Sequence, residues 1–270
     1  MEVVILADNK VVDLRPQGLK AEWGFSALIK AKENILFDTG QTGVAFENML
    51  ILKEDKPAKV ILSHGHYDHT GGLIQFLKAF NLIIYAHPDA FLPRFYKGDY
   101  IGIPFKREQI SAYSKIIEHR EPVEVAKNIW ALGEIPRKHK PALLSNSYIV
   151  RNGEKEFDEI MDDQSVAIKT ENGIALILGC CHAGLRNTVE YAEEVVGDEV
   201  KYIVGGTHLI ALKRNELLDT ISWLDKKVEL IAPCHCTGLE NEFLIKSKLG
   251  DKCKIVGVGS VVKFFNKSKN

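Results

Sequence analysis

Three histidines and one aspartate stand within six residues of this chain, directly after an apolar stretch. His64, His66, Asp68 and His69 follow Val60-Ile61-Leu62. Neutral imidazole and carboxylate are ligands of Zn²⁺ and related divalent ions. The spacing of His64 and His66 lets an extended turn aim both rings at one ion, and Asp68 and His69 can take a second. A histidine-rich solvent loop is the alternative, but a third of the nine histidines fall in this window. We therefore expect a metal site here.

The composition sets the class of protein. The 270 residues are 46% hydrophobic and 26% charged, with a net charge of -1. This balance is that of an ordinary globular protein and excludes a disordered chain, a collagen and a coiled coil. Nothing in the charge suggests a nucleic-acid or membrane partner. Lysine predominates over arginine, which together with glutamate enrichment is typical of a thermophile.

The spacing of the cysteines and the first residues of the chain indicate where in the cell the protein is located. Cys180 with Cys181, and Cys234 with Cys236, are too clustered for a secreted disulfide framework. The chain starts without a basic region or a small-residue cleavage site, so we expect no signal peptide and a cytoplasmic location.

Short β-branched runs alternate with amphipathic stretches along the chain. This order predicts two similar halves, each a sheet with helices outside, packed sheet to sheet. The expected strands are Val3–Leu6, Phe25–Ile29, Asn34–Phe37, Lys59–Leu62, Leu82–Tyr85, Ser165–Thr170, Ile174–Leu178, Tyr202–Val204, Glu229–Ile231 and Lys254–Val256. The expected helices are Thr42–Leu52, Gly72–Phe80, Thr188–Val196, Asn215–Lys226 and Leu239–Leu249.

Residues 90–145 have a different character. They hold five prolines and seven aromatic residues, including Phe91 and Tyr113. We expect a long irregular insertion that lies near the active site, as such loops often do. A surface excursion that packs on its own aromatics is an equal alternative. The same apolar residues would also serve a homodimer.

The motif His-X-His-X-Asp-His after an apolar strand resembles the signature of the metallo-β-lactamase superfamily. The segment Ile35-Leu36-Phe37-Asp38-Thr39-Gly40 resembles another superfamily segment, whose aspartate orients a ligating histidine. For Asp38 the alternative is a turn or helix-capping residue. The chain is identified as a member on these motifs. The resemblance implies an α/β fold, the four-layer αββα sandwich, as a single domain over residues 1–270.

The resemblance also implies further ligands from later strand ends, and here the chain departs from the common pattern. Many members have aspartate where this chain has Cys180, and Met161-Asp162-Asp163-Gln164 replaces a histidine motif. We expect His182 to supply the missing histidine and His235 to be the last ligand. The predicted sets are His64, His66 and His182 for one metal, and Asp68, His69 and His235 for the other.

The clustered cysteines leave alternatives open at this site. Cys180 or Cys181 could ligate as thiolate and favour a softer ion, and Asp163 is another candidate. We slightly favour packing roles for Cys180 and Cys181. We also favour packing for Cys234 and Cys236 over a separate zinc or iron–sulfur site.

A dinuclear site of this kind predicts hydrolysis. Two divalent ions, which we expect to be zinc with manganese or iron as alternatives, would activate water to attack an ester. Asp68 would orient that water. His208 is a candidate for substrate binding or proton transfer, and Arg137 for contact with a substrate phosphate. For His208 a bond to a backbone carbonyl is the alternative, and for Arg137 a solvated turn.

Seven motifs in the same order resemble a narrower group, the dihydropterin–ribofuranosylaminobenzene 5′-phosphate synthases. They include Glu22-Trp23-Gly24, Gly133-Glu134-Ile135-Pro136 and Pro233-Cys234-His235-Cys236. This resemblance implies a phosphorylated small-molecule substrate and a rival function, a transferase that displaces diphosphate. A di-iron redox or metal-binding protein is a third reading, supported by the clustered cysteines. We favour the metal-dependent hydrolase.

Overall fold

Strands with apolar residues on both faces build the centre of the molecule. In the computed structural model, which describes residues 1–141 and 145–264, Val3 and Ile5 of β1 (Glu2–Ala7) face the second sheet. Their neighbours Val4 and Leu6 face the helices on the other side. Because successive side chains of a strand point to opposite faces, an uninterrupted apolar run is the pattern of a strand buried on both sides.

The first sheet comes from the N-terminal half plus the end of the chain. Its strands from β1 to β5 were all predicted within one or two residues. In spatial order the sheet is β17 (Val261–Lys263), β1, β2 (Ser26–Lys30), β3 (Ile35–Phe37), β4 (Lys59–Ile61), β5 (Ile83–Ala86) and β8 (Lys115–Glu118).

The second sheet pairs antiparallel strands on one side with parallel strands on the other. The predicted hairpin at Glu171-Asn172-Gly173 joins β13 to β14. In spatial order the sheet is β16 (Leu230–Cys234), β15 (Val200–Gly206), β14 (Gly173–Leu178), β13 (Val166–Thr170), β10 (Ile129–Ala131) and β9 (Val123–Ala126).

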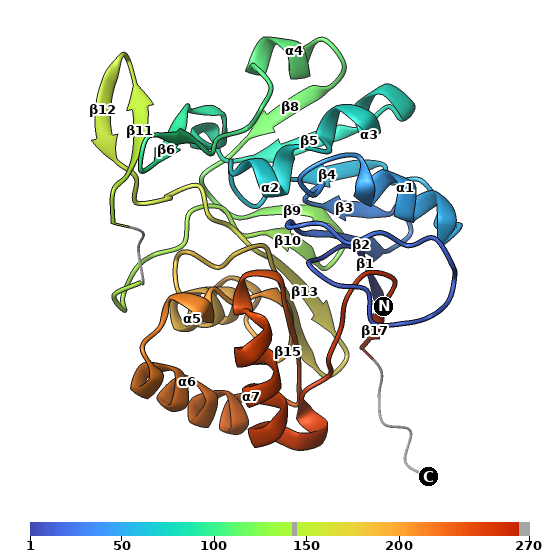
Figure 1. The fold of residues 1–270 in the computed structure, drawn as a ribbon, viewed down its shortest axis with the longest axis vertical. Coiled ribbons are helices and arrows are strands. Elements are labelled where there is room, and N and C mark those ends of the chain that lie inside the picture. The colour runs from blue at the N-terminus through green and yellow to red at the C-terminus, as the bar shows by residue number, and fades with distance from the viewer. Residues whose placement is uncertain (142–144, 265–270) are drawn as a thin grey trace.

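Helices cover the outer faces of both sheets, which gives the expected four-layer αββα sandwich (Figure 1). Those of the first half are α1 (Val44–Ile51), α2 (Tyr67–Thr70), α3 (Leu73–Ala79) and α4 (Arg107–Ser111). Those of the second half are α5 (Leu185–Val196), α6 (Arg214–Lys227) and α7 (Leu239–Leu249). Among the described residues, no helix combines the length and apolar character needed to cross a membrane.

Two expectations about secondary structure were wrong. Lys254–Val256 is not a strand, because its neighbours Cys253 and Val258 form only isolated bridges and the strand of this region is β17. Residues 90–145 are not irregular throughout. They contain β8, β9 and β10, which extend the two main sheets; positions 142–144 lie outside the described residues.

Strands β6 and β7 of this region join two later strands in a small sheet at the edge of the sandwich. Its order is β12 (Glu154–Phe157), β11 (Ser147–Arg151), β6 (Arg94–Tyr96) and β7 (Asp99–Tyr100). This sheet approaches the histidine loop, because the His66 backbone bridges to Gly102 and the Tyr67 N–H donates to the Ile101 carbonyl at 3.0 Å.

Candidate metal centre

The carboxyl ends of parallel strands from both sheets place the site. His64 follows β4 and Asp38 follows β3 in the first sheet. In the second sheet, Cys180 follows β14, and His235 follows β16. Such strand ends are where α/β sheets usually bind their ligands. Residues far apart in the sequence are thereby gathered in one place.

The structure brings together both sets of residues that the sequence proposed. The ligand atoms of His64, His66 and His182 lie within 4.8 Å of one another. Those of Asp68, His69 and His235 form a second such group. These residues are buried, apart from a slightly exposed Asp68 side chain. That these groups hold metal ions remains a prediction.

Asp38 fixes the orientation of two of these rings. The Ser63 N–H donates to its Oδ1 at 2.7 Å, and the Ser63 hydroxyl donates to its Oδ2 at 2.7 Å. Because that hydroxyl proton is committed, Ser63 Oγ accepts from His64 Nδ1 at 2.8 Å. His69 Nδ1 donates directly to Asp38 Oδ2 at 2.6 Å. Both rings therefore carry a proton on Nδ1 and direct Nε2 toward the centre of the site, as the atom that would bind a metal ion.

Several buried ring nitrogens have no protein partner, as expected of metal ligands. His66 Nε2 and both nitrogens of His182 lack hydrogen bonds among the described residues. His64 Nε2 lies 2.8 Å from His66 Nδ1, and His69 Nε2 lies 3.1 Å from His235 Nε2. Buried polar atoms are normally paired, so such convergence fits cations bound between the rings. The donor set thus suits divalent metal ions.

The electrostatics of the site keep most imidazoles neutral. Burial lowers the pKa well below its usual value in four of the rings: His64, His66, His182 and His235. Burial would also lower the pKa of His69, but Asp38 and Asp68 raise it to about 9, so a metal ion that binds His69 Nε2 would displace a proton from it. Neutral imidazole is the form that binds a metal.

Glycines allow the loop to fold tightly. A Cβ at Gly65 would lie 2.1 Å from the Ala90 carbonyl oxygen, and one at Gly71 would lie 1.9 Å from that of Gln41. Any side chain at these positions would displace backbone that supports the histidines.

Cys180 lies at the centre of the site. Its sulfur is 3.2 Å from His69 Nε2. It belongs to three groups of potential ligands: one with His64 and His69, one with His182 and His208, and one with His235 and Cys236. The sequence-based preference for a packing role did not anticipate this position. Burial raises the pKa of Cys180 well above its usual value, so a thiolate here needs a cation beside it.

Strained backbone accompanies the site. The residues Asp38, Cys181, His208 and His235 have φ angles of 58°, 62°, 53° and 49°. This left-handed region is costly for residues other than glycine and is concentrated at functional sites.

The two aspartates that replace the usual histidine motif anchor the metal loops. Asp162 Oδ2 accepts the Gly65 N–H at 2.7 Å, and its Oδ1 accepts from Arg94 Nη2 at 2.8 Å. Asp163 Oδ2 accepts the Ala183 N–H at 2.9 Å, whereas its Oδ1 has no hydrogen-bond partner in the described structure. Burial raises the pKa of Asp163 to about 6.

The predicted substrate residues lie at different distances from the centre. The His208 ring packs on His182 with 4.3 Å between centroids, and both its nitrogens lack hydrogen-bond partners among the described side chains. A bond to a backbone carbonyl, the alternative for His208, is therefore absent from the described structure. Arg137 Nη2 donates to the Ile160 carbonyl at 2.8 Å, which leaves Nε and Nη1 free of hydrogen bonds there.

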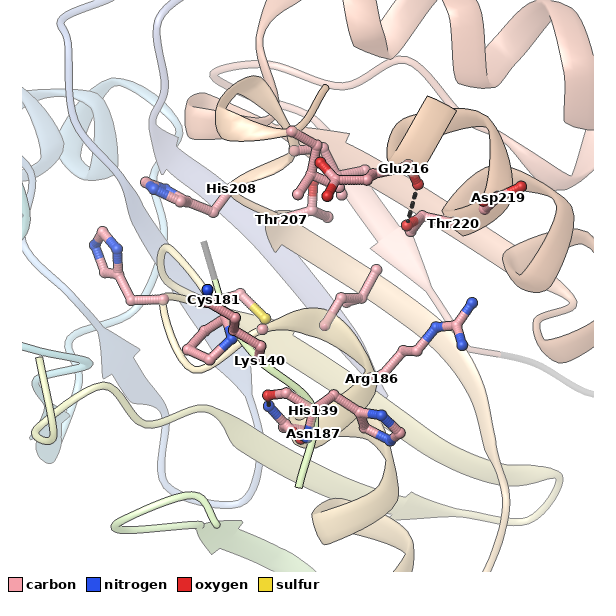
Figure 2. Close-up of a pocket in the computed structure, with 16 residues that line it drawn as sticks. His139, Lys140, Cys181, Arg186, Asn187, Thr207, His208, Glu216, Asp219 and Thr220 are labelled. Carbon is pink, nitrogen blue, oxygen red and sulfur yellow. Dashed lines mark hydrogen bonds between the residues drawn. The ribbon is translucent and has the colours of Figure 1, made fainter. Parts of the chain in front are cut away.

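A cavity of about 290 Å³ opens beside the centre. Figure 2 shows His208 at one end, the α6 residues Glu216, Asp219 and Thr220 at the other, and Arg186 across from them. Lys140 and His139 also line it, so both charge signs are present.

Three residues at the site were missed from the sequence. Asp8 Oδ1 accepts the His235 N–H at 2.8 Å, and the Asn9 amide donates to the His235 carbonyl at 3.2 Å. The Trp23 ring, 51% exposed, lies 5.6 Å from that of His235 and donates to Asp68. Asp8 and Asn9 directly follow β1, so the strand-end argument that selected His64 would have selected them.

Comparisons with known proteins agree with this geometry. The family model described as the Metallo-beta-lactamase superfamily matches residues 24–143. An uncharacterized protein of Methanocaldococcus jannaschii is 36% identical, covering 88% of this chain and 91% of the relative. The 7,8-dihydropterin-6-methyl-4-(beta-D-ribofuranosyl)-aminobenzene-5′-phosphate synthase of the same organism is 30% identical, covering 90% of each chain. The crystal structure of Tm1679, a metal-dependent hydrolase of the beta-lactamase superfamily, is 28% identical with a TM-score of 0.87, covering 98% of this chain and 99% of that chain.

Proposed function

The chain belongs to the metallo-β-lactamase superfamily, and on this premise we propose that it is a metal-dependent hydrolase of a phosphoester or cyclic ester. One observation carries the proposal: two adjacent groups of His and Asp ligand atoms, with Asp38 fixing the protonation of His64 and His69. When bound, two divalent ions would supply Lewis-acid chemistry that lowers the pKa of water and stabilises negative charge on oxygen.

The residues present suit zinc, because imidazole and carboxylate donors predominate. His64, His66 and His182 would hold one ion. Asp68, His69 and His235 would hold the other. Manganese and iron remain the alternatives.

Asp68 is the group best placed to orient water and to accept its proton. Its Oδ2 lies 3.6 Å from His235 Nε2 and 3.9 Å from His69 Nε2, and its side chain keeps 12% exposure. Burial raises the pKa of Asp68 above its usual value, which makes the carboxylate a stronger base. The Trp23 side chain donates to this carboxylate and holds its orientation.

The cavity beside His182 and His208 supports a small, charged substrate. Arg186 and Lys140 offer cations to a phosphate, and Glu216 and Asp219 offer acceptors to hydroxyl or amine groups. His208 would contact the substrate next to the reacting bond. Arg137 remains a second candidate for a phosphate contact.

A transferase is the second candidate function. The 30% identity to the dihydropterin-ribofuranosylaminobenzene phosphate synthase extends over 90% of both chains. A reaction in which an arylamine displaces diphosphate would use the same ligand groups, and the cavity would hold the phosphorylated arylamine. This reaction has no need of Asp68 as a base toward water.

The test uses the purified, zinc-loaded protein with bis(4-nitrophenyl) phosphate and a panel of lactones. We expect metal-dependent turnover, reduced about 10²- to 10⁴-fold in Asp68→Asn. The matched control is Asp99→Asn, an exposed aspartate of β7, which should keep the full rate. Equal rates in Asp68→Asn and wild type would contradict the assignment, and turnover only with an arylamine and a pterin diphosphate would favour the transferase.

A further inference from the structure

We propose that Asn187 is a positioning residue, which fixes residues 139–141 as one wall of the cavity and so places Lys140 to bind a substrate phosphate. This inference rests on the proposed function, which puts a phosphorylated substrate in this cavity. The wall segment, residues 139–141, contributes His139, Lys140 and Pro141 to the lining. Lys140 is the cation that it would offer to the phosphate.

Asn187 joins the wall segment to helix α5 through its side-chain amide. Its Oδ1 accepts the His139 N–H at 2.7 Å, and its Nδ2 donates to the His139 carbonyl at 2.7 Å. The same Nδ2 donates to the Ala183 carbonyl at 2.7 Å. Asn187 is only 2% exposed, and a buried amide is costly to leave unpaired. Because it pairs with both backbone groups of His139, it holds that residue as a neighbouring β-strand would.

The neighbouring side-chain contacts with α5 are exposed. His139 Nε2 lies 2.8 Å from Glu190 Oε1, and Lys138 Nζ lies 3.3 Å from Glu194 Oε2. Asn187, Glu190 and Glu194 are spaced three and four residues apart, so they lie on one face of α5. Ion pairs between exposed side chains contribute little to stability. Among the described contacts, the buried amide therefore does most to hold the wall segment.

The amide also ties the wall segment to the loop that carries His182. Ala183, whose carbonyl accepts from Asn187, directly follows this proposed ligand. A Cβ at Gly184 would lie 3.7 Å from Cα and Cβ of Pro141, so the wall segment packs against the next residue of the loop. The wall of the cavity and the metal loop are thus held in one arrangement.

The charges around the cavity explain why the position of this wall matters. Figure 2 shows Asn187 beside His139 on one side, and Glu216 and Asp219 of α6 on the other. These carboxylates would repel a phosphate, whereas Lys140 would attract it. An anion is therefore expected on the side of the wall segment, where its affinity depends on where Lys140 is held.

Asn187→Ser separates the wall segment from the metal loop. A serine hydroxyl in a helix can donate to the carbonyl four residues earlier, as the Thr188 hydroxyl does to that of Gly184 at 3.0 Å. The serine would therefore keep the bond to Ala183, but it is too short to pair with the backbone of His139. Its effect then reports on the wall segment alone.

Titration calorimetry of the zinc-loaded protein with phenyl phosphate measures this affinity without any turnover. We expect Asn187→Ser and Lys140→Ala each to weaken binding about 10-fold or more. The double variant should bind no more weakly than the weaker single variant, because both changes remove the same contact. The control Glu190→Gln removes only an exposed partner of His139 and should bind within about twofold of wild type. Zinc content, and the KM for a neutral lactone, should be unchanged in Asn187→Ser.

The outcomes separate this inference from the proposed function. Wild-type affinity in folded Asn187→Ser or in Lys140→Ala, or additive losses in the double variant, overturns the positioning role. A fall in the zinc content of Asn187→Ser also overturns it, because the residue would then act through the metal loop. If Asn187→Ser fails to fold, Asn187→Thr, with the same hydroxyl and more volume, decides the question.

The wild-type protein distinguishes the two claims. A zinc-loaded protein that binds no phenyl phosphate overturns this inference even where it hydrolyses lactones. Phenyl phosphate binding that depends on Asn187 and Lys140, in a protein without turnover, supports the inference and counts against the proposed hydrolase.

Discussion

Asp38 controls the protonation of two histidines, and Asp38→Asn should therefore weaken metal binding without removing any ligand. An asparagine keeps one oxygen, which the Ser63 N–H needs, and puts an NH₂ group where Oδ2 was. That NH₂ cannot accept from His69, so His69 must carry its proton on Nε2. It also donates to Ser63 Oγ, whose proton then turns to His64 Nδ1 and forces that ring into the same tautomer.

The expected magnitude follows from these contacts. Removing a hydrogen-bond partner behind a metal ligand typically costs 10- to 100-fold in affinity. Two rings change tautomer here, so a loss at or above ~100-fold is expected. Turning the asparagine amide around would not restore the wild-type tautomers, because the NH₂ group would then face the Ser63 N–H, another donor.

Competition with a zinc chelator measures the affinity of Asp38→Asn and of wild type. Asp8→Asn is the matched control: it is also buried beside the site, but it accepts a backbone N–H from His235, which the asparagine oxygen can still accept. Nitrogen NMR of the imidazoles reports the tautomers independently. Wild-type affinity in folded Asp38→Asn, or unchanged tautomers, would refute the reasoning.

Three further predictions concern the scaffold and are measured by urea unfolding. Gly65→Ala puts a Cβ 2.1 Å from a carbonyl oxygen and should lower the free energy of unfolding by about 1–3 kcal/mol. Its control, Gly43→Ala, meets only a flexible side chain at 3.4 Å and should leave the stability nearly unchanged. Equal losses in the two variants would count against the tight-turn argument. Arg94→Leu leaves two buried carboxylates without their cation and should lower the free energy of unfolding by about 3–5 kcal/mol. The exposed Arg107→Leu is the control and should lower it by less than ~1 kcal/mol. An equally small loss in Arg94→Leu would contradict the role of Arg94 as the partner of these carboxylates. Burial lowers the pKa of His119 in the folded protein, so this histidine binds a proton more readily in the unfolded chain. Wild type should therefore lose stability as the pH falls below about 6.5, and His119→Gln should lose less. Parallel curves of stability against pH for the two proteins would contradict this prediction.

The sequence predicted the strands that are apolar on both faces and the helices between them. The sequence-based prediction missed strands in which the run of apolar residues is short and contains charges. Strand β8 reads Lys115-Ile116-Ile117-Glu118 and β9 reads Val123-Glu124-Val125-Ala126, short runs with charges at the sheet edges. The nearby prolines suggested irregular structure, but pairing with a neighbouring strand decided the outcome.

In the candidate site too, residues close together in the sequence could be predicted, whereas contacts between distant residues could not. The histidines of residues 64–69 are close in sequence, so their chemistry could be read directly. His182 and His235 needed the family resemblance. The contact of Asn9 with His235 joins residues 226 positions apart, and the central place of Cys180 depends on how strands from both sheets meet. No local pattern carries such information.

Elemental analysis of wild type and of His182→Ala tests the central claim most directly. His139→Ala is the control, since this histidine lines the same cavity but is exposed and paired with Glu190. We predict about two zinc ions per chain in wild type and in the control, and about one in His182→Ala. An unchanged metal content in His182→Ala would contradict the assigned ligand set, and a wild-type protein that binds no metal would contradict the account as a whole.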